Sequence, residues 1–232
     1  VAGSSRLHRF PPDGNVTRIA GEQSGVTAVS SAAGKLYVST PQGIFERQGN
    51  TLLPYWTTTS WVAGDYREFD IRGTRLAALN AANNEVVLTD AGQQIASYAP
   101  IWNASSFAPM PQGDWLVSVA NRLIQISADG GTSRVRASSF YAAELEADAN
   151  HAYALSSDGI LTRINADETY TNIAAPEARL TFQAVSLAVS GGGMYQVTGA
   201  GQLLRRDAAF FRHFASGVEG PADLALDSNG RV

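Results

Sequence analysis

The sequence predicts an all-β protein, a six-bladed β-propeller of four-stranded antiparallel blades. A unit of four short apolar strands separated by turns recurs about every 39 residues, and no segment shows a sustained helical period. The turn after the first strand of each unit is marked by Gly34, Gly73, Gly113, Asn150, Gly192 and Gly230. Repetition at this period is typical of propellers and solenoids. A β-sandwich or an open solenoid is the alternative, and the even spacing favours a ring.

The clearest unit covers residues 25–55 and shows the pattern that the others follow. Apolar and polar residues alternate in runs at 26–29, 35–38 and 44–47, followed by Leu52 and Leu53, with Gly-containing turns between them. Such short alternating runs bounded by turn residues indicate β-strands. Further units are expected at 66–98, 103–138, 141–175 and 181–216.

The sixth unit is divided between the two ends of the sequence. Residues 221–232 supply a first strand and its turn, and residues 1–20 supply the remaining strands. We expect the N- and C-terminal strands to share this blade and close the ring, because closure leaves no unpaired strand edge at the seam. No Pro/Gly/Ser-rich linker interrupts the repeat, so residues 1–232 are expected to form a single domain.

Composition excludes several functional classes. The net charge is −4 and the longest basic cluster is Arg205-Arg206, which argues against a nucleic-acid partner. No apolar run approaches the roughly 18 to 20 residues of a membrane span, so direct membrane insertion is not expected. The absence of cysteine excludes disulfides and thiolate sites. A single lysine against sixteen arginines and a start at Val1 indicate a processed or excised bacterial domain. The compartment is not fixed by the sequence, and a periplasmic or cell-surface location is favoured.

Residues 221–230, Pro-Ala-Asp-Leu-Ala-Leu-Asp-Ser-Asn-Gly, resemble the opening of an NHL-type repeat of six-bladed propellers. Asp223 stands where that family has glycine, and the other units match only by spacing and apolar pattern. The signatures of WD and kelch repeats are absent. The resemblance implies a binding or scaffold propeller, with a minority of enzymatic relatives.

Acidic residues recur at the first strands, which line the central channel of a propeller. Aligning these strands on their apolar pairs places the following residues at one level: Val26, Glu68, Ser106, Glu144, Ser186 and Asp223. Two residues deeper are Ala28, Asp70, Ala108, Glu146, Ala188 and Ala225. Five carboxylates therefore converge, and their repulsion predicts raised pKa values or a bound cation, for which Ca²⁺ or Mg²⁺ suits oxygen ligands.

The channel acids also carry a resemblance to gluconolactonase-type propellers, which implies a divalent metal held by rim residues. Glu68, Glu144 and Asp223 would be the analogous metal ligands. The Asn-Asp and Pro-Asn-Gly motifs of that family are absent, and its Pro-Asp-Gly reads Pro221-Ala222-Asp223 here. A metal-dependent lactonase or esterase is therefore the alternative function. Otherwise, the acids are solvated or paired with Arg67, Arg72 and Arg75.

No catalytic residue is assigned from the sequence. His8, His151 and His213 fall in outer strands or turns, and no Gly-x-Ser-x-Gly nucleophile elbow occurs.

Aromatic residues gather between the blades, and the segment from Tyr55 to Tyr66 is longer than a connection needs. Exposed Tyr and Trp on one face indicate a contact surface. The residues expected to contact a partner are Tyr55, Trp56, Trp61, Tyr66, Trp102, Phe140 and Tyr141. The leading hypothesis is a non-catalytic propeller that binds a protein, peptide or carbohydrate on its loop-bearing rim. A purely structural module of a larger surface or secretion assembly is a third possibility.

Overall fold

A computed structural model of the chain describes residues 2–3, 6–9, 17–18, 26–49, 51–57, 66–80, 85–98, 103–110, 112–148, 150–165, 167, 169–176, 183–190, 193–207, 209–216 and 221–226. These residues form strands and turns only, which confirms the all-β prediction. Within these ranges there is no helix that is long and apolar enough to cross a membrane.

The strands form antiparallel sheets in which each strand pairs with the next along the chain. The first such sheet contains β4 (Ala28–Ala32), β5 (Lys35–Thr40), β6 (Gly43–Gln48) and β7 (Thr51–Thr57). The second contains β8 (Tyr66–Arg72), β9 (Arg75–Asn80), β10 (Glu85–Asp90) and β11 (Gln93–Tyr98). The third contains β12 (Ala104–Pro109), β13 (Trp115–Val119), β14 (Arg122–Ile126) and β15 (Ser133–Ala137).

The next eight strands form two similar groups of four. One contains β16 (Glu144–Ala147), β17 (Ala152–Leu155), β18 (Leu161–Ile164) and β19 (Tyr170–Pro176). The other contains β20 (Ala184–Ser190), β21 (Gly193–Thr198), β22 (Gln202–Asp207) and β23 (Phe210–Ser216). A short parallel pairing of β19 with β23, at Ala175↔Phe210 and Pro176↔Phe211, joins the two groups at their outer strands.

Strands from the two ends of the sequence share one further sheet. Its order is β24 (Pro221–Asp223), β1 (Ala2–Gly3), β2 (Arg6–Arg9) and β3 (Thr17–Arg18). Strands β24 and β1 are antiparallel, with Ala2 opposite Asp223 and Gly3 opposite Pro221. An inner strand from the end of the sequence is thus continued by strands from its beginning.

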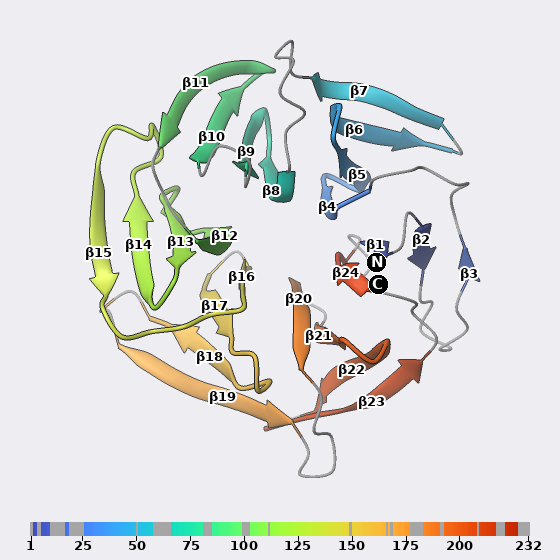
Figure 1. Cartoon of the computed structure of the whole chain (residues 1–232), viewed down its shortest axis with the longest axis vertical. Helices are drawn as coiled ribbons and strands as arrows, with labels where there is room; N and C mark the ends of the chain where they lie inside the picture. The colour runs from blue at the N-terminus through green and yellow to red at the C-terminus, as the bar shows by residue number, and fades with distance from the viewer. Residues whose placement is uncertain are drawn as a thin grey trace.

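The sheets are arranged around a common centre (Figure 1). The first strand of each group, namely β4, β8, β12, β16, β20 or β24, lies nearest to the centre, and the last lies at the outside. Side chains at the start of each inner strand are therefore brought together from segments that are far apart in the sequence.

The backbone conformation explains why glycine occupies the first turn of several sheets. Gly34, Gly73 and Gly113 have φ values of 76°, 62° and 99°, in the left-handed region that side chains with a Cβ avoid. At the corresponding turn of the fourth group, the Asp148 carboxylate accepts hydrogen bonds from the backbone N–H groups of Asn150 and His151, each at 2.7 Å. Gly192 and Gly230 lie outside the described residues.

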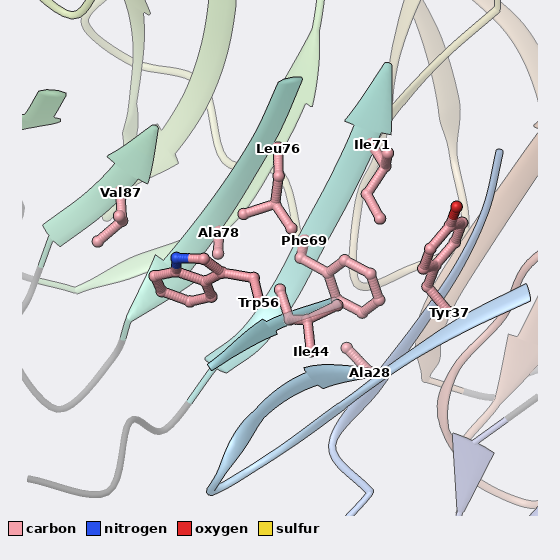
Figure 2. Close-up of a cluster of buried hydrophobic side chains, with 9 residues drawn as sticks. All are labelled: Ala28, Tyr37, Ile44, Trp56, Phe69, Ile71, Leu76, Ala78 and Val87. Atoms are coloured by element: carbon pink, nitrogen blue, oxygen red, sulfur yellow. The ribbon is translucent and has the colours of Figure 1, made fainter. Parts of the chain in front are cut away.

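The apolar core lies between adjacent sheets. Figure 2 shows one such layer, in which side chains of β4 to β7 meet those of β8 to β10. Ile44 and Leu76 are almost wholly buried there, and burial of a side chain of this size stabilises the fold by about 1.5–3 kcal/mol. Because the apolar faces are used between sheets, the inner strands present their polar side chains to the centre.

Candidate functional site

A cavity of about 190 Å³ lies among the inner strands and is lined by five carboxyl groups. Glu68 and Asp70 come from β8, Glu144 and Glu146 from β16, and Asp223 from β24. The structure thus brings together all five acids that the strand alignment expected to converge. They come from segments separated by as much as two thirds of the chain.

The alignment was wrong by two residues in β4. Ala32 pairs with Lys35 at the end of β4, as Arg72 pairs with Arg75 at the end of β8. Counting back four residues from Ala32 and from Arg72 makes Ala28 equivalent to Glu68, and counting back two makes Ser30 equivalent to Asp70. Val26 precedes the strand. Ser30 consequently lines the cavity, where its hydroxyl donates to Asp70 Oδ1 at 3.4 Å.

Glu68 links its own sheet to the next one. Its two carboxyl oxygens each lie 3.1 Å from the backbone N–H of Phe107, and Oε1 also accepts a hydrogen bond of 2.8 Å from the Ser106 hydroxyl. Ser106 Oγ in turn accepts from the backbone N–H of Leu145 at 2.7 Å. These contacts connect β8, β12 and β16 around the cavity.

Asp223 makes the corresponding connection on the opposite side. Its Oδ2 accepts from the backbone N–H of Val29 in β4 at 2.8 Å. Its Oδ1 accepts from the Ser186 hydroxyl in β20 at 2.9 Å and from the Leu224 N–H at 2.8 Å. One carboxylate therefore joins β20, β24 and β4.

The serines at this level were aligned from the sequence but received no role. The pairing register shifts immediately before Glu68, Ser106 and Ser186, at the pairs Tyr66/Glu68, Ala104/Ser106 and Ala184/Ser186. Such irregularities redirect side chains at strand ends. The signal that could have identified the links was the presence of hydroxyl and carboxyl side chains at the same strand position.

Glu144 and Glu146 are less constrained than Glu68 and Asp223. No described residue donates a hydrogen bond to the Glu144 carboxyl group, although it lines the same cavity. Among the described donors, the neighbouring Ala147 N–H alone reaches Glu146 Oε2, at 2.9 Å. Of the arginines expected as partners, Arg72 lines the cavity and donates to Asp70 Oδ2 at 3.3 Å. Arg75 is exposed, and the side chain of Arg67 lies outside the described part.

Burial and mutual repulsion raise the pKa values of the cavity acids. Burial raises the pKa of Glu144 well above its ordinary value, and Glu68, Asp223 and Glu146 add to the effect. Burial likewise raises the pKa of Glu68 and of Glu146, with smaller contributions from neighbouring carboxylates. For Asp223, burial raises the pKa to about 6 against the opposing effect of its hydrogen bonds.

The three expected metal ligands do not fit a bound metal ion. Among the described residues, no three His, Asp or Glu side chains lie close enough together to hold one. The carboxyl oxygens of Glu68 and Asp223 already accept hydrogen bonds from backbone N–H groups. Among the described donors, none reaches Glu144. Glu68, Glu144 and Asp223, as far as the described residues show, are not arranged as a metal site.

The aromatic residues are dispersed. Trp56 is only 9% exposed and packs in the layer of Figure 2, because β7 turns this face toward β8 to β10, so its expected exposure on the rim was wrong. Tyr55 is partly buried, with its ring edge-on to Tyr37 at 5.0 Å. Trp61 and Trp102 lie outside the described residues, as does the side chain of Tyr66.

The loop before β16 holds the two remaining aromatic candidates. Phe140 packs against Tyr170 at 5.0 Å between ring centroids. Tyr141 is 53% exposed and lies three residues before Glu144. It is therefore the described aromatic candidate that is both accessible and close in sequence to a cavity acid.

No histidine of the described region lines the cavity. His213 Nε2 lies 2.7 Å from Ser216 Oγ at the end of the outer strand β23, where the pair is exposed. His151 lies beside Asp148 in a turn. His8 is in β2, and its side chain is not described.

Comparison with known proteins identifies the fold class. No family model and no curated protein matches this sequence. Among solved structures, the WD40 β-propeller domain of Doa1 superimposes with a TM-score of 0.67 at 11% identity, covering 99% of this chain and 86% of that one. YCF48 bound to D1 peptide gives 0.56 at 13% identity, over 81% of this chain and 66% of that one.

A third similar structure is a much longer protein. The extracellular domain of a hybrid two-component system from B. thetaiotaomicron gives a TM-score of 0.61 at 14% identity over 90% of this chain, which spans only 30% of that one. At these identities the similarity shows the fold alone. The fold is a β-propeller.

Proposed function

We propose that this chain is a non-catalytic binding propeller that engages a protein or peptide partner at the face where the loops enter the inner strands. The observation that carries the proposal is the axial cavity, which gathers five carboxyl groups without a nucleophile–base pair among the described residues around it. Such a recess can recognise a ligand whose polar groups complement the carboxyl groups. A carbohydrate partner remains an outcome of the test below.

We further propose that the propeller is six-bladed, closed and a single domain over residues 1–232. The pairing of β24 with β1 and the links from Asp223 to Ser186 and Val29 support closure. Leu224 and Leu226, the apolar residues of the NHL-like stretch, are buried, which supports an NHL-type blade. A periplasmic or cell-surface location is supported by the similarity to an extracellular domain.

The partner class rests on two observations. A propeller of similar fold, YCF48, was solved with a peptide bound. Tyr141 is exposed in the loop that leads to Glu144, and tyrosine is a frequent anchor in protein interfaces.

The proposal is tested by panning a displayed random peptide library and a glycan array on the immobilised protein. We expect enriched peptides whose affinity falls by about tenfold in Tyr141→Ala, the usual effect of truncating a central aromatic contact. Phe210→Ala is the matched control, because Phe210 is also an exposed aromatic residue but lies on the outer strand β23. Equal loss in both variants, or no enrichment from either library, contradicts the proposal.

The alternative metal-dependent hydrolase has one observation in its favour, since Glu68, Glu144 and Asp223 line the same cavity. It is tested by melting the protein with millimolar Ca²⁺ or Mg²⁺, because a bound ion raises the melting temperature by mass action. A rise that is lost in Glu144→Gln, together with metal-dependent cleavage of lactones or esters, would replace the binding proposal. An unchanged melting temperature removes the alternative.

A further inference from the structure

We propose that Met194 is a site of oxidation by hydrogen peroxide, and that the guanidinium group of Arg206 accommodates the resulting sulfoxide within the fold. The inference is independent of the proposed binding function. In the reaction, the thioether sulfur attacks one peroxide oxygen, the O–O bond breaks and an S–O bond forms. The second oxygen leaves as water with both protons of the peroxide, so the sulfur is oxidised and the peroxide is reduced.

Sulfur is confined to two positions in this chain. The sequence contains two methionines, Met110 and Met194, and no cysteine. Met110 is only 2% exposed, whereas Met194 in β21 is partly buried and packs against the cluster that includes Leu204 and Phe211. Because an oxidant must reach the sulfur, Met194 is the methionine that peroxide attacks first in the folded protein.

Both sulfur atoms lie against an arginine that also holds the group β16 to β19. Arg206 Nη1 lies 3.7 Å from Met194 Sδ, and Nη2 donates to the backbone carbonyl of Ile173 in β19 at 3.2 Å. Arg136 Nη1 lies 3.4 Å from Met110 Sδ, and its Nη2 donates to the carbonyl that directly follows β18 at 2.9 Å. The two pairs share one arrangement and differ in the accessibility of the sulfur.

The guanidinium group of Arg206 lacks oxygen acceptors for several of its donors. Its Nε is buried and has no hydrogen-bond partner in the part of the chain that the structure describes. The acceptor at Nη1 is a thioether sulfur, which accepts hydrogen bonds only weakly. A sulfoxide would offer an oxygen instead, and a hydrogen bond from a charged donor is roughly twice as strong as a neutral one.

This contact reverses the usual effect of methionine oxidation. A sulfoxide is polar, so its formation in an apolar cluster ordinarily disrupts packing. Beside Arg206 the new oxygen meets a donor that lies close to the sulfur, and the hydrogen bond offsets the loss of apolar contact. The fold therefore tolerates oxidation at Met194.

Peroxide treatment of the intact protein, followed by proteolysis and mass spectrometry, tests the site. We expect Met194 to gain one oxygen atom while Met110 stays reduced until urea unfolds the protein. Met194→Leu, a change of similar volume, is the control and should gain no oxygen at methionine in the folded state. Oxidation of Met110 first, equal oxidation of both methionines, or oxidation of neither overturns the inference.

Melting curves of reduced and oxidised protein test the role of Arg206. Oxidation should lower the melting temperature of Arg206→Leu by ~4 °C or more relative to its effect on the wild type, because leucine offers no donor to the sulfoxide. Arg205→Leu is the matched control, since Arg205 is an exposed neighbour on the same strand, and it should respond to oxidation as the wild type does. Equal responses of wild type and Arg206→Leu contradict the proposal.

The stereochemistry of the product provides a test that needs no variant. Oxidation at sulfur gives two sulfoxide epimers, and a donor on one side of the sulfur favours the epimer whose oxygen faces it. The Met194 peptide released from the oxidised wild type should therefore be reduced mostly by one of the two epimer-specific methionine sulfoxide reductases. The same peptide oxidised free in solution should be reduced by both. Equal proportions of the epimers in the two samples overturn the inference.

Discussion

Asp223 joins three inner strands through a single carboxyl group. Val29 N–H, Leu224 N–H and the Ser186 hydroxyl all donate to it, so both of its oxygens are acceptors. An asparagine has only one acceptor oxygen and turns an NH₂ group toward a donor. We therefore expect Asp223→Asn to lower the free energy of unfolding by about 2–3 kcal/mol.

Urea denaturation at neutral pH measures the effect of Asp223→Asn. The surface variant Asp207→Asn serves as the control, because its side chain is 63% exposed and its ion pair contributes little. Equal stability of the two variants would show that the Asp223 carboxylate does not hold the inner strands together.

Replacement of Glu144 is expected to have the opposite effect on stability to replacement of Asp223. It accepts no hydrogen bond from a described residue, and burial together with Glu68, Asp223 and Glu146 disfavours its charge. Glu144→Gln should therefore raise the melting temperature at pH 8, because the amide cannot carry the charge that burial disfavours. The gain should shrink as the pH is lowered, because the raised pKa favours the neutral, protonated form of the wild-type group. A lower melting temperature of the variant at pH 8 is incompatible with this view of Glu144.

The pH dependence of wild-type stability follows from the same acids. A carboxyl group whose folded-state pKa is raised binds its proton more tightly in the folded protein, so its stabilising contribution is complete below the unfolded-state pKa and is lost as pH rises through the folded-state pKa. For Asp223, with a folded-state pKa of about 6, this loss falls between about pH 4 and pH 6 and amounts to at most about 3 kcal/mol. Glu68, Glu144 and Glu146 shift in the same direction.

We expect urea denaturation to show that the free energy of unfolding of the wild type decreases as the pH rises from 5 to 8. In the Glu144→Gln variant this decrease should be smaller. The groups that face Glu144 are Glu68 on β8, Asp223 on β24 and Glu146 on its own strand. A free energy of unfolding that increases steadily from pH 5 to pH 8 would show instead that the cavity acids are paired with cations.

At the scale of strands, Ser106 connects three sheets by donating to Glu68 and accepting from the Leu145 N–H. Ser106→Ala removes one of the donors to Glu68, which keeps the Phe107 N–H, and leaves the buried Leu145 N–H without its acceptor. We expect the free energy of unfolding to fall by about 1–3 kcal/mol. Ser97→Ala on the outer strand β11 is the control, because Ser97 is exposed. Comparable urea midpoints for the two variants would contradict a role for Ser106 in joining the sheets.

The strands themselves were predictable because alternation and turn residues are local signals. The sheet expected at 66–98 begins with the strand Tyr66–Arg72 and ends with the strand Gln93–Tyr98. The error in β4 arose because Val26-Thr27-Ala28-Val29 offers two equally apolar registers. The turn settles the register, since Ala33 and Gly34 both have positive φ and fix the pairing of Ala32 with Lys35.

The contacts of the candidate site were less predictable than its members. Alignment gathered the five acids at the cavity, but it could not tell that Glu68 and Asp223 would accept backbone N–H groups while Glu144 would not. Those partners depend on the rotation of one sheet against the next. For the same reason the sequence did not reveal that Trp56 faces the core or that β19 pairs with β23.

At the scale of the whole molecule, the proposed closed ring depends on β24 and β1. Their pairing brings Gly3 opposite Pro221, so these positions are neighbours in space although they are separated by most of the chain. Replacing both by cysteine offers a direct test, because the native chain contains no other thiol. The disulfide of Gly3→Cys/Pro221→Cys would close a loop that spans nearly the whole sequence, which restricts the unfolded chain by up to about 5 kcal/mol.

We expect the double variant to form an intramolecular disulfide under mild oxidation and to unfold at higher urea concentration when oxidised than when reduced. The single variants Gly3→Cys and Pro221→Cys, which cannot form this bond, should respond to the redox state only by intermolecular cross-linking. If the two thiols stay reduced in the folded protein, or react only between molecules, the terminal strands do not share a blade.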